Sequence, residues 1–246
     1  MNQLEPLPSS IEFPRKKGRW ILLSVLYRFT RFFRLLIGER RTIFVLLNLN
    51  YVFWRIAYEN SYRFFGQTFP NRSYGISTEL ISRFLPMSGT VIDIGCGGGR
   101  ISAMAAEAAS VVLGIDYDIN CIEFAKKNNA YSNVTYKCCN LNEYIGNEKF
   151  DVAILAGVLE HIDSAQEYLV KLHKVAHRLI IEVPDFCADP LNLIRFNLGC
   201  RLYTDNDHVR EYTPELLEYQ LCQSKWKILY WRQQGLMITV VVESVL

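Results

Sequence analysis

The stretch VIDIGCGGG, residues 91–99, decides the fold of this chain. Its first four residues are compatible with a β-strand, and they lead directly into a turn that is almost entirely glycine. Glycine has no Cβ and tolerates positive φ, so a ligand can approach the backbone of such a turn closely. A helical pattern follows over residues 101–109 and presents its free N–H groups to the same place. The stretch therefore predicts a strand that ends in a cofactor-binding loop.

A second short strand follows at the distance that a nucleoside site requires. Val111–Asp116 is rich in β-branched residues and ends in a carboxylate roughly 20 residues after Gly95. A carboxylate at this position suits hydrogen bonds to the two hydroxyls of a ribose. The two strands and the helix between them predict a nucleoside-binding βαβ unit.

The spacing of the glycines indicates which nucleoside is bound. A dinucleotide site requires G-x-G-x-x-G, but Arg100 takes the last position, and the pattern that fits is Gly95-x-Gly97-x-Gly99. Together with the preceding Asp93, this pattern resembles the first motif of the class I S-adenosylmethionine (SAM) dependent methyltransferases. The resemblance covers about residues 76–246 and implies SAM as the cofactor.

The resemblance continues downstream in the expected order. Asp116-Tyr117 is similar to the family's ribose and adenine contact, and Cys139-Asn140-Leu141 to its adenine-edge loop. Asn140 stands where the family often has aspartate, but its amide oxygen can still accept from the adenine amino group. Phe150–Ala156 resembles the fourth strand, and the LEHI segment at 159–162 resembles small-molecule methyltransferases related to ubiquinone-pathway enzymes.

The resemblance implies a set of cofactor-binding residues in the loops at one edge of the sheet. These are Asp93, Gly95, Cys96, Gly97, Gly99, Asp116, Tyr117, Asn140, Leu141 and Ala156. For Cys96, we favour a small residue that fits the loop over a reactive thiol.

The rest of this region alternates between helical and strand patterns. Helices are predicted over 77–85, 120–130, 164–176 and 214–222, and strands over 134–139, 150–156, 178–183, 226–231 and 236–242, with a loop over 184–213. Thr213-Pro214 is an N-cap followed by proline at the first helical position. Alternating units require parallel strands, whereas the short connection at 233–235 requires an antiparallel hairpin. We expect an α/β fold with a Rossmann-like, seven-stranded, mostly parallel sheet, an antiparallel C-terminal hairpin and additional N-terminal helices.

Residues 1–75 do not follow this pattern and are expected to form a helical N-terminal segment ahead of a methyltransferase domain at 76–246. Arginines recur at three-residue spacing at Arg28, Arg31 and Arg34. The opposite helix face is apolar, with Leu22, Val25, Leu26, Phe29, Phe33 and Leu36. Charges interrupt it too often for a bilayer span, which needs about 20 apolar residues. Two alternatives stay open, a cap on the methyltransferase domain or contact with an anionic membrane surface.

Composition adds limits rather than a function. The chain has 246 residues, half of them hydrophobic, which is enough for one α/β domain and an appendage. Seven cysteines lack a C-x-x-C pair, so we expect neither a metal site nor a disulfide framework. Because no disulfides are expected, we expect a cytoplasmic location. The basic helix leaves open a peripheral position on the inner face of a membrane.

Methyl transfer to oxygen requires a base for the acceptor proton. His161 lies just past the fourth strand, at the carboxyl edge where open α/β folds bind ligands, and is the expected catalytic residue. A structural histidine beside the cofactor is the alternative role. His208 is a second candidate, although we expect a loop histidine of this kind to be solvated.

The predicted function is SAM-dependent methyl transfer to a small-molecule acceptor, most simply a hydroxyl of a glycan, a lipid-linked compound or a secondary metabolite. A nucleic-acid substrate is disfavoured, because LAGV at 155–158 replaces the Asn/Asp-Pro-Pro-aromatic motif of base methylation. The other alternative is a methyltransferase-like interaction module that binds SAM without transferring a methyl group, or that has lost the cofactor. The intact Gly95, Gly97, Gly99 and Asp116 argue against that loss.

Overall fold

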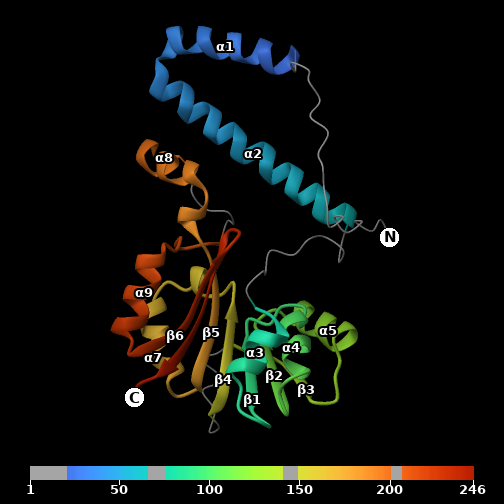
Figure 1. The fold of residues 1–246 in the computed structure, drawn as a ribbon. Coiled ribbons are helices and arrows are strands. Elements are labelled where there is room, and N and C mark those ends of the chain that lie inside the picture. Colours follow the sequence, from blue (N-terminus) through green and yellow to red (C-terminus); the bar gives the residue numbers. More distant parts are fainter. Residues whose placement is uncertain (1–20, 66–75, 141–148, 201–206) are drawn as a thin grey trace, which may run out of the picture. The chain divides into compact units, whose positions relative to one another are not determined.

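The computed structural model describes residues 21–65, 76–140, 149–200 and 207–246 (Figure 1). The chain divides into two compact units. The smaller comprises Met1–Asn71 and Pro190–Leu202, and the larger comprises Arg72–Asp189 and Tyr203–Leu246.

The larger unit is built on a seven-stranded sheet with the strand order β3-β2-β1-β4-β5-β7-β6. The strands are β1 (Thr90–Ile94), β2 (Val111–Asp116), β3 (Val134–Cys138), β4 (Phe150–Ala156), β5 (Ala176–Pro184), β6 (Trp226–Gln234) and β7 (Met237–Ser244). The first five are mutually parallel, whereas β7 pairs antiparallel with both β5 and β6. This confirms the mostly parallel, Rossmann-like sheet with an antiparallel C-terminal hairpin.

Helices cover both faces of this sheet (Figure 1). They are α3 (Thr78–Phe84), α4 (Arg100–Ala106), α5 (Ile119–Asn128), α7 (Ala165–Leu172) and α9 (Pro214–Gln223), together with the 3-10 turns η2 (Leu159–His161) and η3 (Phe186–Ala188). Side chains alternate along each strand, so that in β4 Ala153 and Leu155 pack with α7 and α9, whereas Val152 and Ile154 pack with α3 and α4. Two apolar cores, one on each face, thus hold the strand ends in place.

Several sequence predictions for residues 76–246 are wrong in detail. The helix expected over 101–109 ends at Ala106. The helix expected over 164–176 ends at Leu172, because Ala176 pairs with Phe150 as the first residue of β5. The loop expected over 184–213 contains η3 and a further helix, α8 (Pro190–Leu198). Pro190 is the first residue of α8, a position where proline is favoured, so it is a local sequence signal for the start of this helix.

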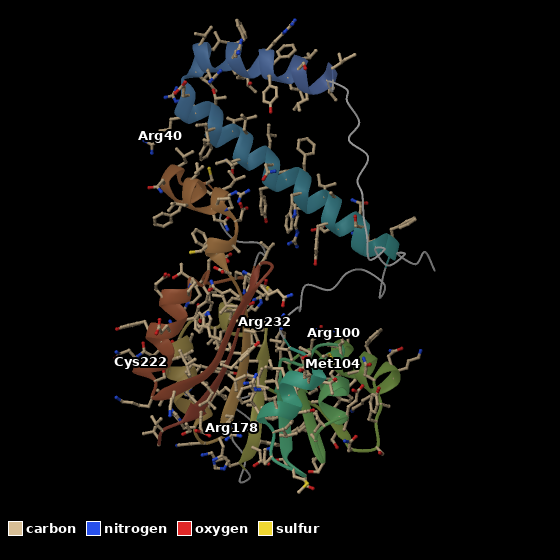
Figure 2. All side chains as sticks on the ribbon, in the orientation of Figure 1. Arg40, Arg100, Met104, Arg178, Cys222 and Arg232 are labelled. Carbon is tan, nitrogen blue, oxygen red and sulfur yellow. The ribbon has the colours of Figure 1, made fainter. Side chains whose placement is uncertain are left out.

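The smaller unit consists of α1 (Ile21–Ile37), α2 (Glu39–Phe65) and α8. Gly38, with φ of +83°, makes the turn between α1 and α2. Arg195 of α8 is buried, and its Nη2 donates to Asn50 Oδ1 of α2 at 2.8 Å. No residue of α1 is buried, and its side chains project from the helix on several sides, including the side of α2 (Figure 2). Within the described part of the chain, no helix is both long and apolar enough to cross a membrane.

Candidate functional site

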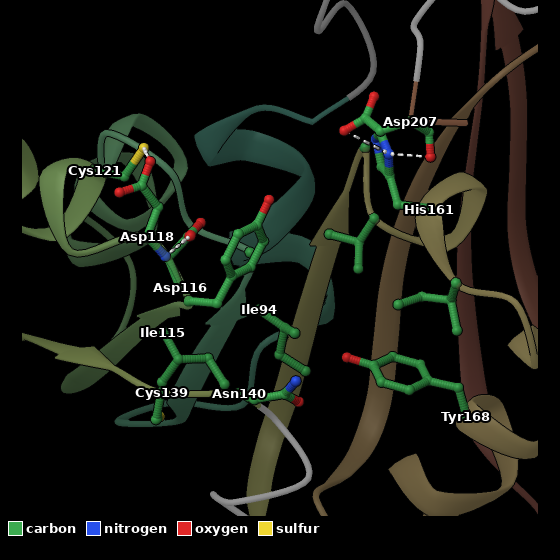
Figure 3. Close-up of a pocket in the computed structure, with 15 residues that line it drawn as sticks. Ile94, Ile115, Asp116, Asp118, Cys121, Cys139, Asn140, His161, Tyr168 and Asp207 are labelled. Carbon is green, nitrogen blue, oxygen red and sulfur yellow. Dashed lines mark hydrogen bonds and ion pairs between the residues drawn. The ribbon is translucent and has the colours of Figure 1, made fainter. Parts of the chain in front are cut away.

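A pocket of about 400 Å³ opens at the carboxyl ends of β1, β2 and β4 (Figure 3). One wall comes from the ends of β1 and β2 and the loops beyond, and includes Gly95, Asp116 and Asn140. The other wall comes from the segment after β4 and from α7, and includes His161 and Tyr168. The strand order reverses between β1 and β4, and such a switch point is where open α/β sheets bind ligands.

Hydrogen bonds join the glycine loop to the end of β2. The N–H groups of Gly95 and Cys96 both donate to the Ile115 carbonyl, at 2.8 and 3.0 Å. Gly97 N–H donates to Asp116 Oδ2 at 2.8 Å, and Asp118 N–H donates to Oδ1 at 2.9 Å. A carboxylate oxygen has two acceptor sites, so Asp116 can still accept from a ribose hydroxyl at either oxygen.

Close packing, as well as backbone conformation, requires glycine in this loop. Gly95 has φ of +70°, and a Cβ there would lie 2.7 Å from Val158 Cγ2 across the pocket. Gly99 has φ of +80°, and a Cβ there would lie 2.5 Å from the Tyr136 hydroxyl. A side chain at either position would push apart the elements that form the site.

Asp93 lies beneath the loop and Cys96 within it, and neither residue lines the pocket. Asp93 is buried in β1 and accepts from Ser102 Oγ of α4 at 2.6 Å. Burial raises the pKa of Asp93 to about 6, although the Ser102 hydrogen bond opposes the shift. Cys96 is buried against α5, and burial raises the pKa of its thiol. A buried thiol with a raised pKa is a poor nucleophile at neutral pH.

The other predicted cofactor residues occupy different places. Tyr117 lines the pocket but is 81% exposed. Gly99 precedes α4, and its carbonyl accepts from Ala103 N–H. Ala156 ends β4 just before the pocket, which is lined by the next two residues instead. Leu141 lies outside the described residues.

Asp207 orients the His161 ring at the edge of the pocket. His161 Nδ1 lies 3.3 Å from the Asp207 carbonyl oxygen and 3.3 Å from its carboxylate Oδ2. Both atoms can only accept, so Nδ1 carries the hydrogen and Nε2 of the neutral ring has the free lone pair. In this tautomer Nε2 can accept a proton.

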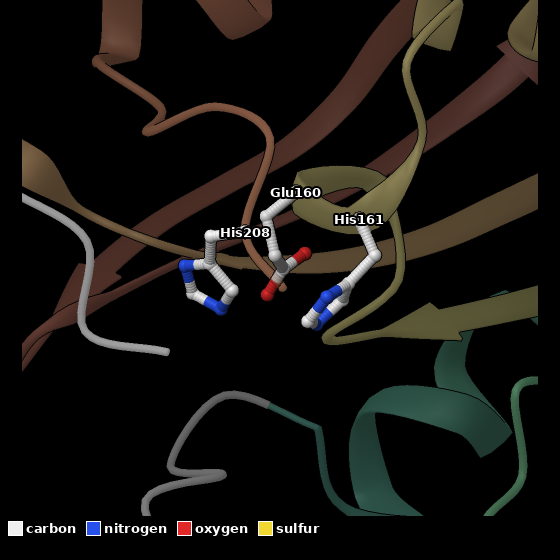
Figure 4. Close-up of side chains that lie close together, drawn as sticks. All are labelled: Glu160, His161 and His208. Atoms are coloured by element: carbon white, nitrogen blue, oxygen red, sulfur yellow. The ribbon is translucent and has the colours of Figure 1, made fainter. Parts of the chain in front are cut away.

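His208 and Glu160 lie beside His161 (Figure 4). The His208 and His161 rings meet edge to face with centroids 4.7 Å apart. The side chain of His208 is only 7% exposed, so the prediction that it is solvated is wrong. The backbone of Glu160 holds this segment, because its carbonyl accepts from the N–H groups of Val209 and Arg210.

The Glu160 carboxyl is buried between the two histidines. Its Oε2 has no hydrogen-bond partner among the described residues, and burial raises its pKa to about 7. One ligand atom each from Glu160, His161 and His208 lies within 4.8 Å of the others, so these residues could hold a metal ion. The sequence predicted no metal site here. Glu160 and His161 are adjacent, but His208 follows 47 residues later, and this is not a metal-binding spacing such as C-x-x-C.

The sequence interpretation missed several residues that line the pocket. They are Ile94, Ile115, Asp118, Cys121, Gly157, Val158, Ile162, Tyr168 and Asp207. Asp118, Gly157 and Val158 come within two residues of a strand end, so a rule that counts the first residues after each parallel strand would have found these three. Asp207 has no such indication, because it reaches His161 from 46 residues away.

Comparisons with known proteins agree with this geometry. Residues 87–228 match a family described as "Methyltransferase domain". Ubiquinone biosynthesis O-methyltransferase from Haemophilus ducreyi is 38% identical over 80 residues, which is 29% of this chain and 34% of that protein. The mitochondrial enzyme of Rattus norvegicus is 26% identical over 98 residues, 37% of this chain and 28% of that protein. The chain thus matches about a third of the length of these curated relatives.

Solved structures show the same fold at low sequence identity. A SAM-dependent methyltransferase from Methanosarcina mazei has a TM-score of 0.54 and 17% identity, covering 68% of this chain and 97% of that one. One from Mesorhizobium loti has a TM-score of 0.52 and 16% identity, covering 67% and 96%. The solved structures show the fold, and the family model matches more than half of the chain. The chain therefore belongs to the methyltransferase-domain family.

Proposed function

We propose that this enzyme methylates a hydroxyl of a small molecule and that His161 accepts the hydroxyl proton. The observation that supports this best is the pocket itself, with Asp116 on one wall and His161 on the other. SAM supplies an already activated methyl group, so the protein has to align the acceptor, exclude water and remove one proton.

The proposed cofactor site uses the first wall. Asp116 would bind the ribose, Gly95 and Gly97 would lie beside the methionine end, and Tyr117 and Asn140 would contact the adenine. The pocket volume of about 400 Å³ is within the range of small-molecule sites, roughly 300 to 1,000 Å³. The remaining acceptor sites of the Asp116 carboxylate, exposed at the pocket surface, fit a ribose diol.

The proposed base uses the second wall. Asp207 fixes Nδ1–H of His161, which leaves Nε2 to accept the proton as the methyl group is transferred. Protonation at Nε2 gives an imidazolium whose charge the Asp207 carboxylate stabilises. Asp207 therefore acts as a positioning residue for His161.

Substitution of His161 tests this assignment. We expect His161→Gln to lower turnover by about 10² to 10⁴ while the dissociation constant for SAM changes little. Asp207→Asn should lower turnover less, and His177→Gln, at an exposed histidine on β5, serves as the matched control. Loss of SAM binding or of folding in His161→Gln would instead give His161 a structural role. Wild-type protein that binds SAM but transfers methyl to no acceptor would indicate an interaction module.

The acceptor is proposed to be a glycan, a lipid-linked compound or a secondary metabolite, with preference for a bulky or membrane-associated one. The O-methyltransferase names of the relatives support oxygen as the acceptor atom. The test is transfer of labelled methyl from SAM to separated lipid, glycan and soluble metabolite fractions. Alkali-stable label in the lipid fraction supports an ether product, whereas label only in protein or nucleic acid would contradict the proposal.

The helical unit supports a proposed contact with an anionic membrane surface. We propose residues 76–246 as the catalytic domain and residues 1–75 as the segment that makes this contact. The predicted apolar face of α1 is exposed, with fractions between 41% for Val25 and 64% for Leu36. An exposed patch of this kind marks an interaction site, and three arginines with no acidic residue in α1 favour an anionic partner.

Vesicle flotation tests the membrane contact in the full-length protein. We expect wild type to float with anionic vesicles and to bind less as salt screens the arginines. Phe29→Ser with Phe33→Ser should abolish flotation, whereas Val170→Ser with Tyr219→Ser removes exposed apolar side chains of the other unit and should not. Wild type that ignores vesicles would favour the cap.

A further inference from the structure

The arginines of α1 face α2, and the two helices form a cleft of about 630 Å³ between them. Arg28, Arg31 and Arg34 line this cleft from α1. Four hydroxyl groups line it as well, from Ser24, Tyr27, Thr30 and Thr42. No carboxylate of the described chain lines the cleft; the acidic side chain nearest in sequence, Glu39, lies 3.8 Å from Arg34 Nη1 and outside the lining.

This lining is suited to a phosphate group. A guanidinium presents several N–H donors in a planar fork that matches two phosphate oxygens. The hydroxyls of Ser24 and Tyr27 can add donors, whereas those of Thr30 and Thr42 already donate to the carbonyls of Tyr27 and Gly38, both at 2.9 Å. The volume is also within the roughly 300 to 1,000 Å³ typical of ligand sites. An apolar ligand would displace water from the guanidinium groups without replacing its hydrogen bonds, so the cleft favours an anion.

The surroundings of the cleft indicate where the phosphate comes from. Ile43 and Leu46 of α2 complete the lining of the cleft. Phe29 and Phe33 lie on the face of α1 opposite the arginines, and both are exposed, at 57% and 48%. Helix α2 adds exposed apolar side chains such as Phe53, at 67%. A ligand with an anionic head next to apolar chains would satisfy both features, and a phospholipid in a bilayer has this arrangement.

We propose that the α1–α2 cleft binds the phosphate of an anionic membrane phospholipid while the apolar side chains of α1 enter the acyl region. The proposal rests on the membrane contact proposed above and adds a specific headgroup site to it. The arginines thus select the lipid headgroup, and the phenylalanines anchor the helix. The apolar residues alone would bind any bilayer surface.

The experiment measures partitioning of the full-length protein onto three kinds of vesicle. These are phosphatidylcholine alone, phosphatidylcholine with phosphatidic acid, and phosphatidylcholine with oleate at equal surface charge. Arg28→Gln with Arg31→Gln removes two cleft arginines. Arg41→Gln with Arg63→Gln removes the same charge from exposed positions of α2 outside the cleft and is the matched control. SAM binding, measured in parallel, reports that each variant is folded.

We expect the cleft variant to lose about 25-fold in partitioning onto phosphatidic acid vesicles, since each arginine near an anionic surface contributes about 5-fold. The loss on oleate vesicles should be smaller, and the control should lose less than the cleft variant on phosphatidic acid. Equal losses for the two variants, or for the two anionic vesicles, would overturn the cleft site but leave membrane contact intact. Wild type that binds none of the vesicles would overturn both, while SAM binding would show that the methyltransferase assignment is unaffected.

Discussion

Replacing Asp93 with asparagine should change how the stability of this protein depends on pH. Asp93 is buried beneath the glycine loop, and its pKa is raised from 3.8 to about 6. In the folded state the carboxyl therefore keeps its proton to higher pH than in the unfolded chain. Because the native state binds the extra proton, the free energy of unfolding falls as pH rises between these two values.

The size of the effect follows from the two pKa values. One pKa unit corresponds to about 1.4 kcal/mol, so ionised Asp93 costs the fold about 3 kcal/mol above about pH 6. Asparagine resembles the protonated carboxyl and its amide oxygen can still accept from Ser102 Oγ. We expect the two proteins to be similarly stable near about pH 4 and Asp93→Asn to be about 3 kcal/mol more stable near about pH 7.

Urea unfolding of both proteins across this pH range measures the difference directly. Other titrating groups are common to both proteins and cancel in the comparison. Asp163→Asn, which removes an exposed carboxyl, is the control for loss of one charge. A stability difference between wild type and Asp93→Asn that does not change with pH would refute the reasoning.

Two further substitutions test the local geometry. Gly99→Ala should lower the free energy of unfolding by about 1 to 3 kcal/mol, because the new Cβ at φ of +80° would lie 2.5 Å from the Tyr136 hydroxyl. Gly97→Ala, whose Cβ would have no atom within 4 Å, should lower it less. Equal losses in the two variants would contradict this account. Thr213→Ala should cost about 1 kcal/mol by removing the N-cap hydrogen bond from Leu216 N–H to Thr213 Oγ1, and Thr213→Ser should retain most of the stability in the same urea assay.

Much of the fold could be predicted because its determinants are local. The glycine turn after β1 and the carboxylate that ends β2 are short-range patterns with few alternative structures. Thr213-Pro214 marks the start of α9, and the Thr213 side chain caps it as expected. The turn before β7 is too short for the crossover that parallel strands need, so it predicted the antiparallel hairpin that β6 and β7 form.

The errors concern features that depend on distant contacts. Helix α8 belongs to the same unit as α2, and the buried Arg195 joins it to Asn50, 145 residues earlier in the chain. Neither partner indicates this contact in its own sequence neighbourhood. The end of α7 is a similar case, because pairing of Ala176 with β4 overrides the helical pattern.

The candidate site divides in the same way. Asp116 ends β2, and Gly95 and Asn140 come just after β1 and β3, so their position at one edge of the sheet follows from the topology. The orientation of His161 depends on Asp207, and the burial of His208 depends on its contact with the His161 ring. Those contacts join two segments outside the regular helices and strands. The hydrophobic periodicity that predicts helices and strands does not predict contacts between such segments.

The dissociation constant for SAM, measured by calorimetry in wild type and Asp116→Ala, tests the central claim most directly. If Asp116 binds the ribose, its loss should weaken binding by roughly 1.5 to 3 kcal/mol, the range of a charge-assisted hydrogen bond, or about 10- to 150-fold. Asp163→Ala should bind as wild type does, and thermal unfolding should show that both variants are folded. An unchanged dissociation constant in folded Asp116→Ala would contradict the proposed cofactor site.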